Sequence, residues 1–125
     1  MPNLTEPIRL SDLLKFEEAE IQYSRDQVTL ASGNDLPRGA VLGVITASGK
    51  YAEFDPAATN GTQAAKAVLL YPSDASAADL QVTALKRYAV VAKQHLAWKT
   101  GTTAGEILAA LAQLEAVGII ARDAA

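Results

Sequence analysis

Apolar positions near the C-terminus recur with the period of an amphipathic helix. The positions that share one helical face are Ile107, Leu108, Leu111 and Leu114. Thr103 and Glu106 have the spacing of a capping box, and Gly118 suits the left-handed residue that ends many helices. The pattern therefore predicts one helix between Thr103 and Gly118, followed by a short strand at residues 119–120.

The middle of the chain has the pattern of strands joined by turns. Val28 and Leu30 alternate with polar residues, which is typical of a half-buried strand. Residues 40–46 are rich in β-branched side chains, and residues 50–54 return after a hairpin loop in which Gly49 supplies a positive φ. Further strands are expected at 68–71 and, as a pair or one bent strand, at 80–91, with turns or loops at 31–35, 55–63 and 73–79. The fold class is therefore mainly β with a small α part (α+β).

Residues 1–22 differ from this body. Within them a loose apolar series is formed by Ile8, Leu10, Leu13, Leu14 and Phe16. The spacing of Leu10, Leu13 and Leu14 fits one or two helical turns, whereas the alternation of Ile8 and Leu10 fits a strand equally well. The segment is too short to bury these side chains alone, so it either folds back on the body or docks on a partner. We divide the chain into an extended N-terminal arm (1–22) and a single β-rich domain (23–125).

The charge of the chain is concentrated in its first fifth. Residues 1–26 contain six acidic and three basic residues, which accounts for the whole net charge of −3. The remaining residues contain equal numbers of acidic and basic side chains. This mild acidity argues against a nucleic-acid-binding surface, which needs a basic stripe. No apolar run reaches the roughly 20 residues of a membrane helix, and no signal peptide is recognisable.

The sequence offers no convincing catalytic, cofactor-binding or metal-binding site. Without cysteine there is no disulfide, no thiolate nucleophile and no cysteine-ligated metal. The single histidine, His95, lies next to Leu96 and is expected to be a packed or edge residue. Asp74 and Asp79 lack the contrasting environments that an acid–base pair requires. We therefore expect a structural or assembly protein rather than an enzyme.

Several segments, in order and spacing, resemble the lambda head protein D-like family of bacteriophage head decoration proteins. They are LPRGAVLGVITASGKY (36–51), DPAATNGTQAA (55–65), LKR (85–87), LEAVGII (114–120) and YSRDQVTL (23–30). The resemblance covers residues 23–122. Two departures from the family pattern are Asn60, where an aspartate is expected, and residues 88–90, where a small and then an acidic residue are more common.

The resemblance implies a β-clip-like body and a structural, non-enzymatic role without cofactors. It implies a homotrimer that binds the major capsid protein at the three-fold and quasi-three-fold positions of the expanded icosahedral head and stabilises the head against DNA pressure. Such proteins contact neither nucleic acid nor membrane, and they lie on the outer surface of the virion after assembly in the host cytoplasm. Their N-terminal segment is typically mobile when free and becomes ordered on the shell.

We hypothesise that the apolar residues of the arm carry the docking on the capsid: Ile8, Leu10, Leu13, Leu14 and Phe16. Two alternatives stay open. One is a small-molecule-binding or enzymatic β-clip domain, which would need a deep pocket lined by residues such as Asp55, Asn60 and His95. The other is a non-viral adaptor module whose arm binds a different protein.

Overall fold

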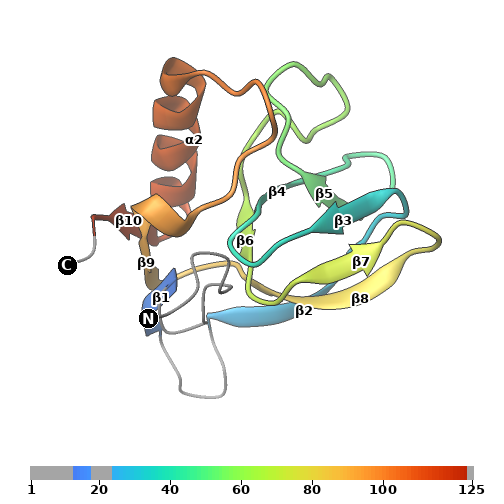
Figure 1. Cartoon of the computed structure of the whole chain (residues 1–125), viewed down its shortest axis with the longest axis horizontal. Helices are drawn as coiled ribbons and strands as arrows, with labels where there is room; N and C mark the ends of the chain where they lie inside the picture. The colour runs from blue at the N-terminus through green and yellow to red at the C-terminus, as the bar shows by residue number, and fades with distance from the viewer. Residues whose placement is uncertain (1–12, 18–23, 124–125) are drawn as a thin grey trace, which may run out of the picture.

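The computed structural model describes residues 13–17 and 24–123 (Figure 1). The strands in this part of the chain are β1 (Leu14–Glu17), β2 (Arg25–Leu30), β3 (Asn34–Leu36), β4 (Val41–Val44), β5 (Tyr51–Glu53), β6 (Ala67–Leu69), β7 (Ser73–Ala75), β8 (Leu80–Leu85), β9 (Ala89–Ala92) and β10 (Ile119–Arg122). A 3-10 helix, η2 (Lys93–His95), and one α-helix, α2 (Ala104–Ala116), complete them. The predicted fold class, mainly β with a small α part, is confirmed.

Five strands close into a small barrel in the order β2, β5, β4, β6 and β8. The longest pairing joins β2 to β8 in antiparallel register from Arg25↔Leu85 to Leu30↔Leu80. Successive side chains of a strand point to opposite faces, so Val28 and Leu30 both face the interior. The barrel core is made of Val28, Leu30, Leu36, Ala40, Leu42, Tyr51, Ala67, Leu69, Ala75, Val82 and Ala84.

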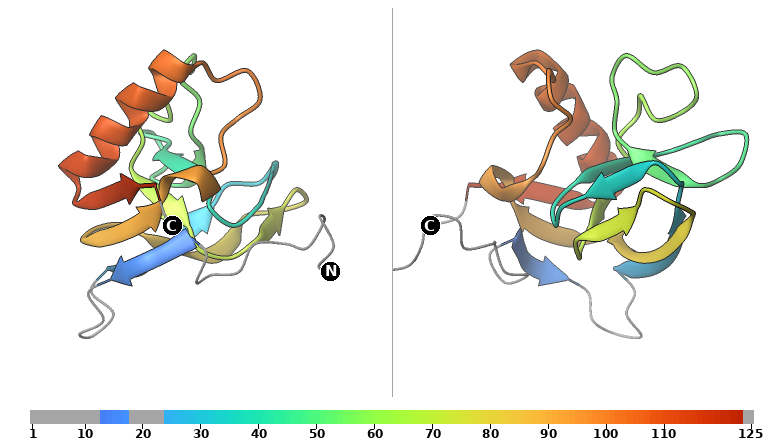
Figure 2. Two further views of the ribbon diagram at one scale, coloured as in Figure 1. Left: turned by 60° about the vertical axis from the view of Figure 1, so that its left-hand side comes forward. Right: turned by 45° about the vertical axis from the view of Figure 1, so that its right-hand side comes forward.

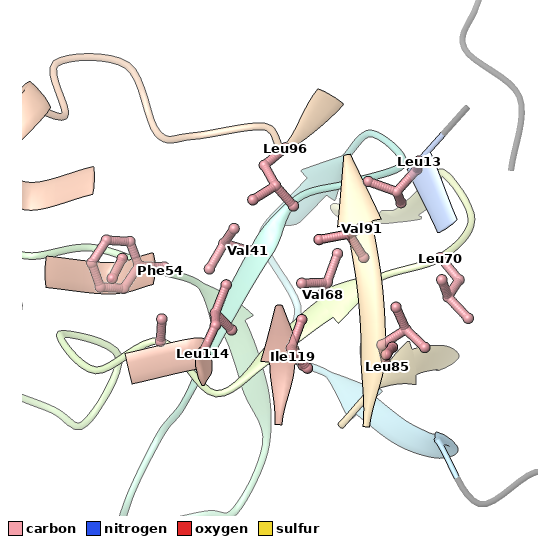
Figure 3. Packing of buried hydrophobic residues seen from close by; sticks show 13 residues of the cluster. Leu13, Val41, Phe54, Val68, Leu70, Leu85, Val91, Leu96, Leu114 and Ile119 are labelled. Atoms are coloured by element: carbon pink, nitrogen blue, oxygen red, sulfur yellow. The ribbon is translucent and has the colours of Figure 1, made fainter. Parts of the chain in front are cut away.

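A second core lies between the barrel and the C-terminal part of the chain (Figure 3). Strand β4 contributes Leu42 to the barrel core and Val41 to this outer core, so it is buried on both faces. A strand buried on both faces reads as a continuous apolar run, which is what residues 40–46 show. The outer core contains Leu13, Val41, Phe54, Ala65, Val68, Leu70, Leu85, Ala89, Val91, Leu96, Ala110, Leu114 and Ile119.

The two ends of the described chain meet in a three-stranded sheet with the order β1, β9, β10. Strand β1 is antiparallel to β9, with Leu14 opposite Val91, and a bulge separates Leu14 from Phe16. Strand β10 is parallel to β9, from Ile119↔Ala89 to Arg122↔Ala92. Two segments almost a whole chain apart therefore flank the same strand.

A polar two-stranded sheet, β3 with β7, covers one side of the barrel, opposite α2 and β10 (Figures 1 and 2). Its antiparallel register runs from Asn34↔Ala75 to Leu36↔Ser73. The sequence reading of residues 31–35 as a turn and of 73–79 as a connection was therefore wrong at β3 and β7. Both strands are short and mostly polar, and the pairing partner lies about 40 residues away, which leaves no local pattern.

The predicted helix boundaries are confirmed. Thr103 accepts a hydrogen bond from the backbone N–H of Glu106 (3.2 Å), and Glu106 Oε1 accepts one from the backbone N–H of Thr103 (2.9 Å). Gly118, with φ of 88°, follows the helix and leads into β10. The predicted inward face is wrong at Leu108, which is 68% exposed, while Ala110 and Leu114 are the helical residues that are buried.

Candidate protein-binding surfaces

The arm residues of the sequence hypothesis fall into two groups. Ile8 and Leu10 lie outside the described residues. Leu13 is fully buried in the outer core, and Leu14 is half-buried against it. Phe16 is placed by its backbone in β1, opposite Val90. Residues 13–17 of the arm thus fold back on the body, which is one of the two arrangements that the sequence left open.

Strand β1 forms one edge of the three-stranded sheet, and β10 forms the other. Among the described strands, β1 pairs only with β9. An edge strand presents backbone N–H and C=O groups that can pair with a strand of another molecule. The sheet that receives the arm therefore offers a strand edge at the point where the described chain begins.

A shallow apolar cavity of about 360 Å³ lies between the loops at residues 37–38 and 94–97. The two loops approach closely at Gly39, where a side chain would collide with the carbonyl oxygen of His95. The backbone N–H of Ala97 donates a 2.8 Å hydrogen bond to the carbonyl oxygen of Gly39, which holds the two loops together. The cavity is lined by Pro37, Arg38, Pro72, Gln94, His95, Leu96 and Ala97.

The residues of the enzymatic alternative do not share this cavity. His95 lines it, but Asp55 and Asn60 belong to the loop at residues 55–63 and are not among its lining. The Oδ1 atom of Asp55 accepts a 3.0 Å hydrogen bond from the backbone N–H of Ala57. Asn60 Oδ1 accepts bonds from both the backbone and the hydroxyl of Thr62, at 3.1 and 2.7 Å. These carboxylate and amide oxygens support turns.

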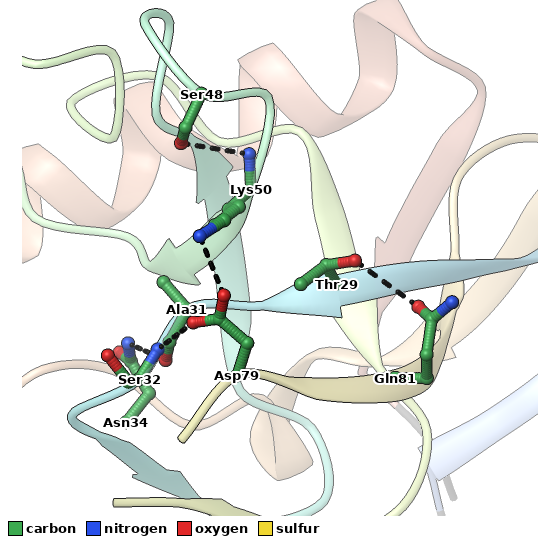
Figure 4. A network of polar contacts seen from close by, with 8 residues as sticks. All are labelled: Thr29, Ala31, Ser32, Asn34, Ser48, Lys50, Asp79 and Gln81. Atoms are coloured by element: carbon green, nitrogen blue, oxygen red, sulfur yellow. Dashed lines mark hydrogen bonds and ion pairs between the residues drawn. The ribbon is translucent and has the colours of Figure 1, made fainter. Parts of the chain in front are cut away.

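Asp79 is also a structural residue (Figure 4). Its carboxylate forms a 2.6 Å ion pair with Lys50 and accepts a 2.8 Å hydrogen bond from the backbone N–H of Ser32. The hydrogen bond from Lys50 is the largest cause that holds the pKa of Asp79 below its ordinary value, and the bond from Ser32 adds to it. The hydroxyl of Ser76 does the same for the pKa of Asp74. Neither carboxyl has the raised pKa of a general acid.

A short turn before β9 presents an exposed tyrosine. Tyr88 has φ of 49°, is 55% exposed, and lies directly after the basic residues Lys86 and Arg87. Asp26 pairs with both of them, at 2.8 Å from Arg87 and 3.6 Å from Lys86. The hydrogen bond from Arg87 is the main reason that the pKa of Asp26 lies below its ordinary value. Positive φ is unusual for a residue other than glycine, so this turn is held in place by its surroundings.

The outward side of α2 is the surface that sequence reasoning missed. Its exposed residues are Ala104, Gly105, Leu108, Ala109, Ala112, Glu115 and Ala116, and we call this set the α2 outer face. Leu108 is the most exposed large apolar residue of the described chain. The signal was present in the sequence, because the helix carries only two charged residues, Glu106 and Glu115.

Two further findings concern other kinds of site. Across residues 13–17 and 24–123, no three histidine, cysteine, aspartate or glutamate side chains are grouped so that they could hold a metal ion. No helix in the same part of the chain combines the length and the apolar character needed to cross a membrane.

Comparison with known sequences decides the family. The sequence model of the bacteriophage lambda head decoration protein D family matches residues 3–119. The chain belongs to this family. No curated protein matches the chain.

Membership in the head decoration family gives the chain a structural role in decorating the phage capsid. It implies association with the capsid and a location at the capsid surface of the virion. The match begins ten residues before Leu13 and ends at the first residue of β10, so it takes in the arm as well as both cores.

Proposed function

We propose that this chain forms a homotrimer that binds the expanded icosahedral head at its three-fold and quasi-three-fold positions and stabilises it against DNA pressure. Its partner is the major capsid protein, and assembly takes place in the host cytoplasm. The observation that supports this proposal is the family match over residues 3–119. The role requires no catalytic residue and no cofactor.

The arm is divided between two tasks in this proposal. Leu13 and Leu14 anchor its root on the body, because Leu13 is fully buried and β1 is paired with β9. Ile8 and Leu10, which precede this anchor, reach the shell. An added strand gains backbone hydrogen bonds without a preformed pocket, which suits a short segment that carries Ile8 and Leu10.

Trimerisation offsets the cost of ordering each arm. A single short segment loses conformational freedom when it binds, and this reduces its affinity. Three arms on one trimer bind with a high effective concentration once the first has docked. A ligand that binds the expanded shell better than the unexpanded shell also shifts the equilibrium toward the expanded state. Both effects allow a small protein to bind the expanded shell tightly and to stabilise it.

Co-sedimentation with expanded, undecorated heads of the phage that carries this chain tests the proposal. The full chain is expected to bind saturably, at one trimer per three-fold site. A chain that lacks residues 2–12 keeps Leu13 and β1, so it is expected to stay folded and trimeric but to bind heads at least about tenfold more weakly. Removal of residues 2–22 also takes away the buried Leu13 and is expected to lower stability.

The matched control is a full-length chain in which Ile8 and Leu10 are both replaced by serine. It keeps the length of the arm and should bind as weakly as the chain that lacks residues 2–12. If the full chain is folded but does not bind expanded heads, the capsid role is wrong. If both arm variants saturate heads as the full chain does, the arm assignment is wrong and the body alone makes the contact.

A further inference from the structure

The α2 outer face has a composition that is unusual for a helix in contact with water. Surface helices of globular proteins place charged residues opposite their buried side. Of the seven exposed residues on α2, only Glu115 is charged. The rest are glycine, alanine and the 68% exposed Leu108. A helix that is apolar on nearly all sides is normally covered on all sides.

The small residues of this face allow close contact with another element. Gly105, Ala109, Ala112 and Ala116 follow one another at spacings of four, three and four, which places them in one stripe. The distance at which another element packs on a helix depends on the side chains at the contact and is shortest where they are small. Leu108 stands beside this stripe as the one large apolar side chain.

A groove lies next to the stripe, between α2 and β10, and has a volume of about 430 Å³. Its apolar lining comes from Leu108, Leu111, Ala112, Ile120 and Ala121. Glu115 on the helix side and Arg122 on the strand side also line it. Figures 1 and 2 show α2 and β10 together at the periphery of the molecule, away from the β3–β7 pair.

We propose that this surface is the contact between copies of the chain. The inference rests on the proposed homotrimer and names the faces that form it. In a cyclic trimer the helix side of one copy meets the strand side of the next, and this contact is repeated three times. Leu108 of one copy enters the groove of its neighbour, and Glu115 of one copy faces Arg122 of the other.

The charges that line the groove indicate which molecule binds there. In the cyclic arrangement, the acidic Glu115 on the helix side of one copy lies opposite the basic Arg122 on the strand side of the next, so the two sides are complementary in charge. Its apolar centre lacks charge, as the centre of a subunit interface does. A strongly acidic or basic partner would find only one residue of opposite charge here. A second copy of the chain matches both the apolar stripe and the pair of charges.

Analytical ultracentrifugation of purified variants tests this inference. The wild-type chain is expected to be a trimer. Ala112→Glu and Leu108→Glu each place a carboxylate in the contact and should raise the concentration at half-assembly at least about tenfold. Leu80→Glu is the matched control, because Leu80 is also an exposed leucine (39%) but lies on β8 in the barrel, outside the α2 outer face. It should leave assembly unchanged.

A charge exchange makes the test independent of folding. Glu115→Arg and Arg122→Glu should each weaken the trimer, and the double variant should restore it, because the opposite charges are then only interchanged between neighbours. Both residues are exposed in the single copy, so neither change is expected to unfold the chain. Circular dichroism checks that each variant keeps its helix.

The outcomes separate this inference from the proposed function. A wild-type chain that is folded but monomeric would remove the trimer from the proposed function, and the inference with it. If the wild type is a trimer and Ala112→Glu, Leu108→Glu and both single charge variants are trimers as well, the subunit contact lies elsewhere. If the variants stay trimeric but no longer bind expanded heads, the α2 outer face contacts the capsid instead, which also overturns the inference.

Discussion

The hydroxyl of Ser24 donates a 2.8 Å hydrogen bond to the carbonyl oxygen of Tyr88, 64 residues further along the chain. Ser24 is fully buried at the entry to β2, and Tyr88 forms the positive-φ turn before β9. The bond therefore connects the start of the barrel to the three-stranded sheet. Gly118 supports the same turn, because its carbonyl oxygen accepts a 3.1 Å hydrogen bond from the backbone N–H of Ala89.

Replacement of Ser24 by alanine should lower the free energy of unfolding by about 0.5–1.5 kcal/mol, because the hydrogen bond from the buried Ser24 hydroxyl to the carbonyl oxygen of Tyr88 is lost. Ser73→Ala is the matched control, since Ser73 also donates to a backbone carbonyl, that of Tyr71 (2.9 Å), but at an exposed site. Its cost should stay within about 0.5 kcal/mol. Urea denaturation of both variants gives the comparison, and equal costs would contradict it.

A side chain at Gly61 is expected to destabilise the fold for a steric reason. It has φ of 114°, and a side chain there would collide with the carbonyl oxygen of Val44. Gly33 has φ of 95° but nothing within 4 Å of the position of a side chain. Both alanine variants bear the cost of positive φ, so the difference between them measures the collision. Gly61→Ala should be about 1–3 kcal/mol less stable than Gly33→Ala by thermal or urea unfolding.

The buried root of the arm should contribute to stability as a core residue does. Leu13→Ala is expected to lower the free energy of unfolding by about 2–5 kcal/mol, because it leaves a cavity in the outer core. Leu80→Ala, at a 39% exposed position, should cost less than about 1 kcal/mol. If the free protein tolerates both changes equally in urea denaturation, Leu13 is not held in the core.

The ion pair of Asp26 should give stability a dependence on acid pH. The hydrogen bond from Arg87 is the main cause that lowers the pKa of Asp26 in the folded state below the ordinary 3.8. The stabilisation is therefore complete above that value and is lost as pH falls through the lower folded pKa. Asp26→Asn should be less stable than wild type at pH 6, and the difference should disappear toward pH 2.

The size of this effect is limited, because the Asp26 side chain is 43% exposed. We expect less than about 1 kcal/mol at low ionic strength and a smaller difference in 1 M salt. Thermal unfolding of the two proteins between pH 2 and pH 6 provides the measurement. A difference that stays constant over this range would show that the carboxylate charge is not responsible.

Elements whose signals lie close together in the sequence could be predicted. The capping pair of Thr103 and Glu106 fixed the start of α2, and Gly118 fixed its end. The hairpin loop at Gly49 was also correct, with φ of 75°. In each case the residues that determine the structure lie within a few positions of it, so a local pattern is sufficient.

Elements that depend on distant partners could not be predicted. The β3–β7 pair joins residues about 40 positions apart, and neither strand has an alternating apolar pattern. The closure of the barrel, in which Leu30 lies beside both Tyr51 and Leu80, has the same long-range character. Periodicity reports which side of an element is apolar and does not report which element covers it.

The candidate surfaces illustrate the same limit. The sequence could not decide whether Leu13 packs on the body or on a partner, because both uses need an apolar side chain. Leu108 had the spacing of the inward face of α2 and lies on the outward face. Polar and apolar residues are only weakly separated between the sides of α2, which indicates that this helix has more than one apolar side.

The position of β1 beside β9 has a consequence for the order of synthesis. Leu14 pairs with Val91, so a nascent chain must grow by about 77 residues before β1 has its partner. At roughly 5–20 residues per second, translation takes roughly 4–15 s over this distance. The barrel strands, which end at Leu85, leave the ribosome after β1 and before β9. During that interval β1 of one nascent chain can pair with β9 of a more advanced chain on the same messenger RNA, so exchange of the first strand between copies competes with folding during translation.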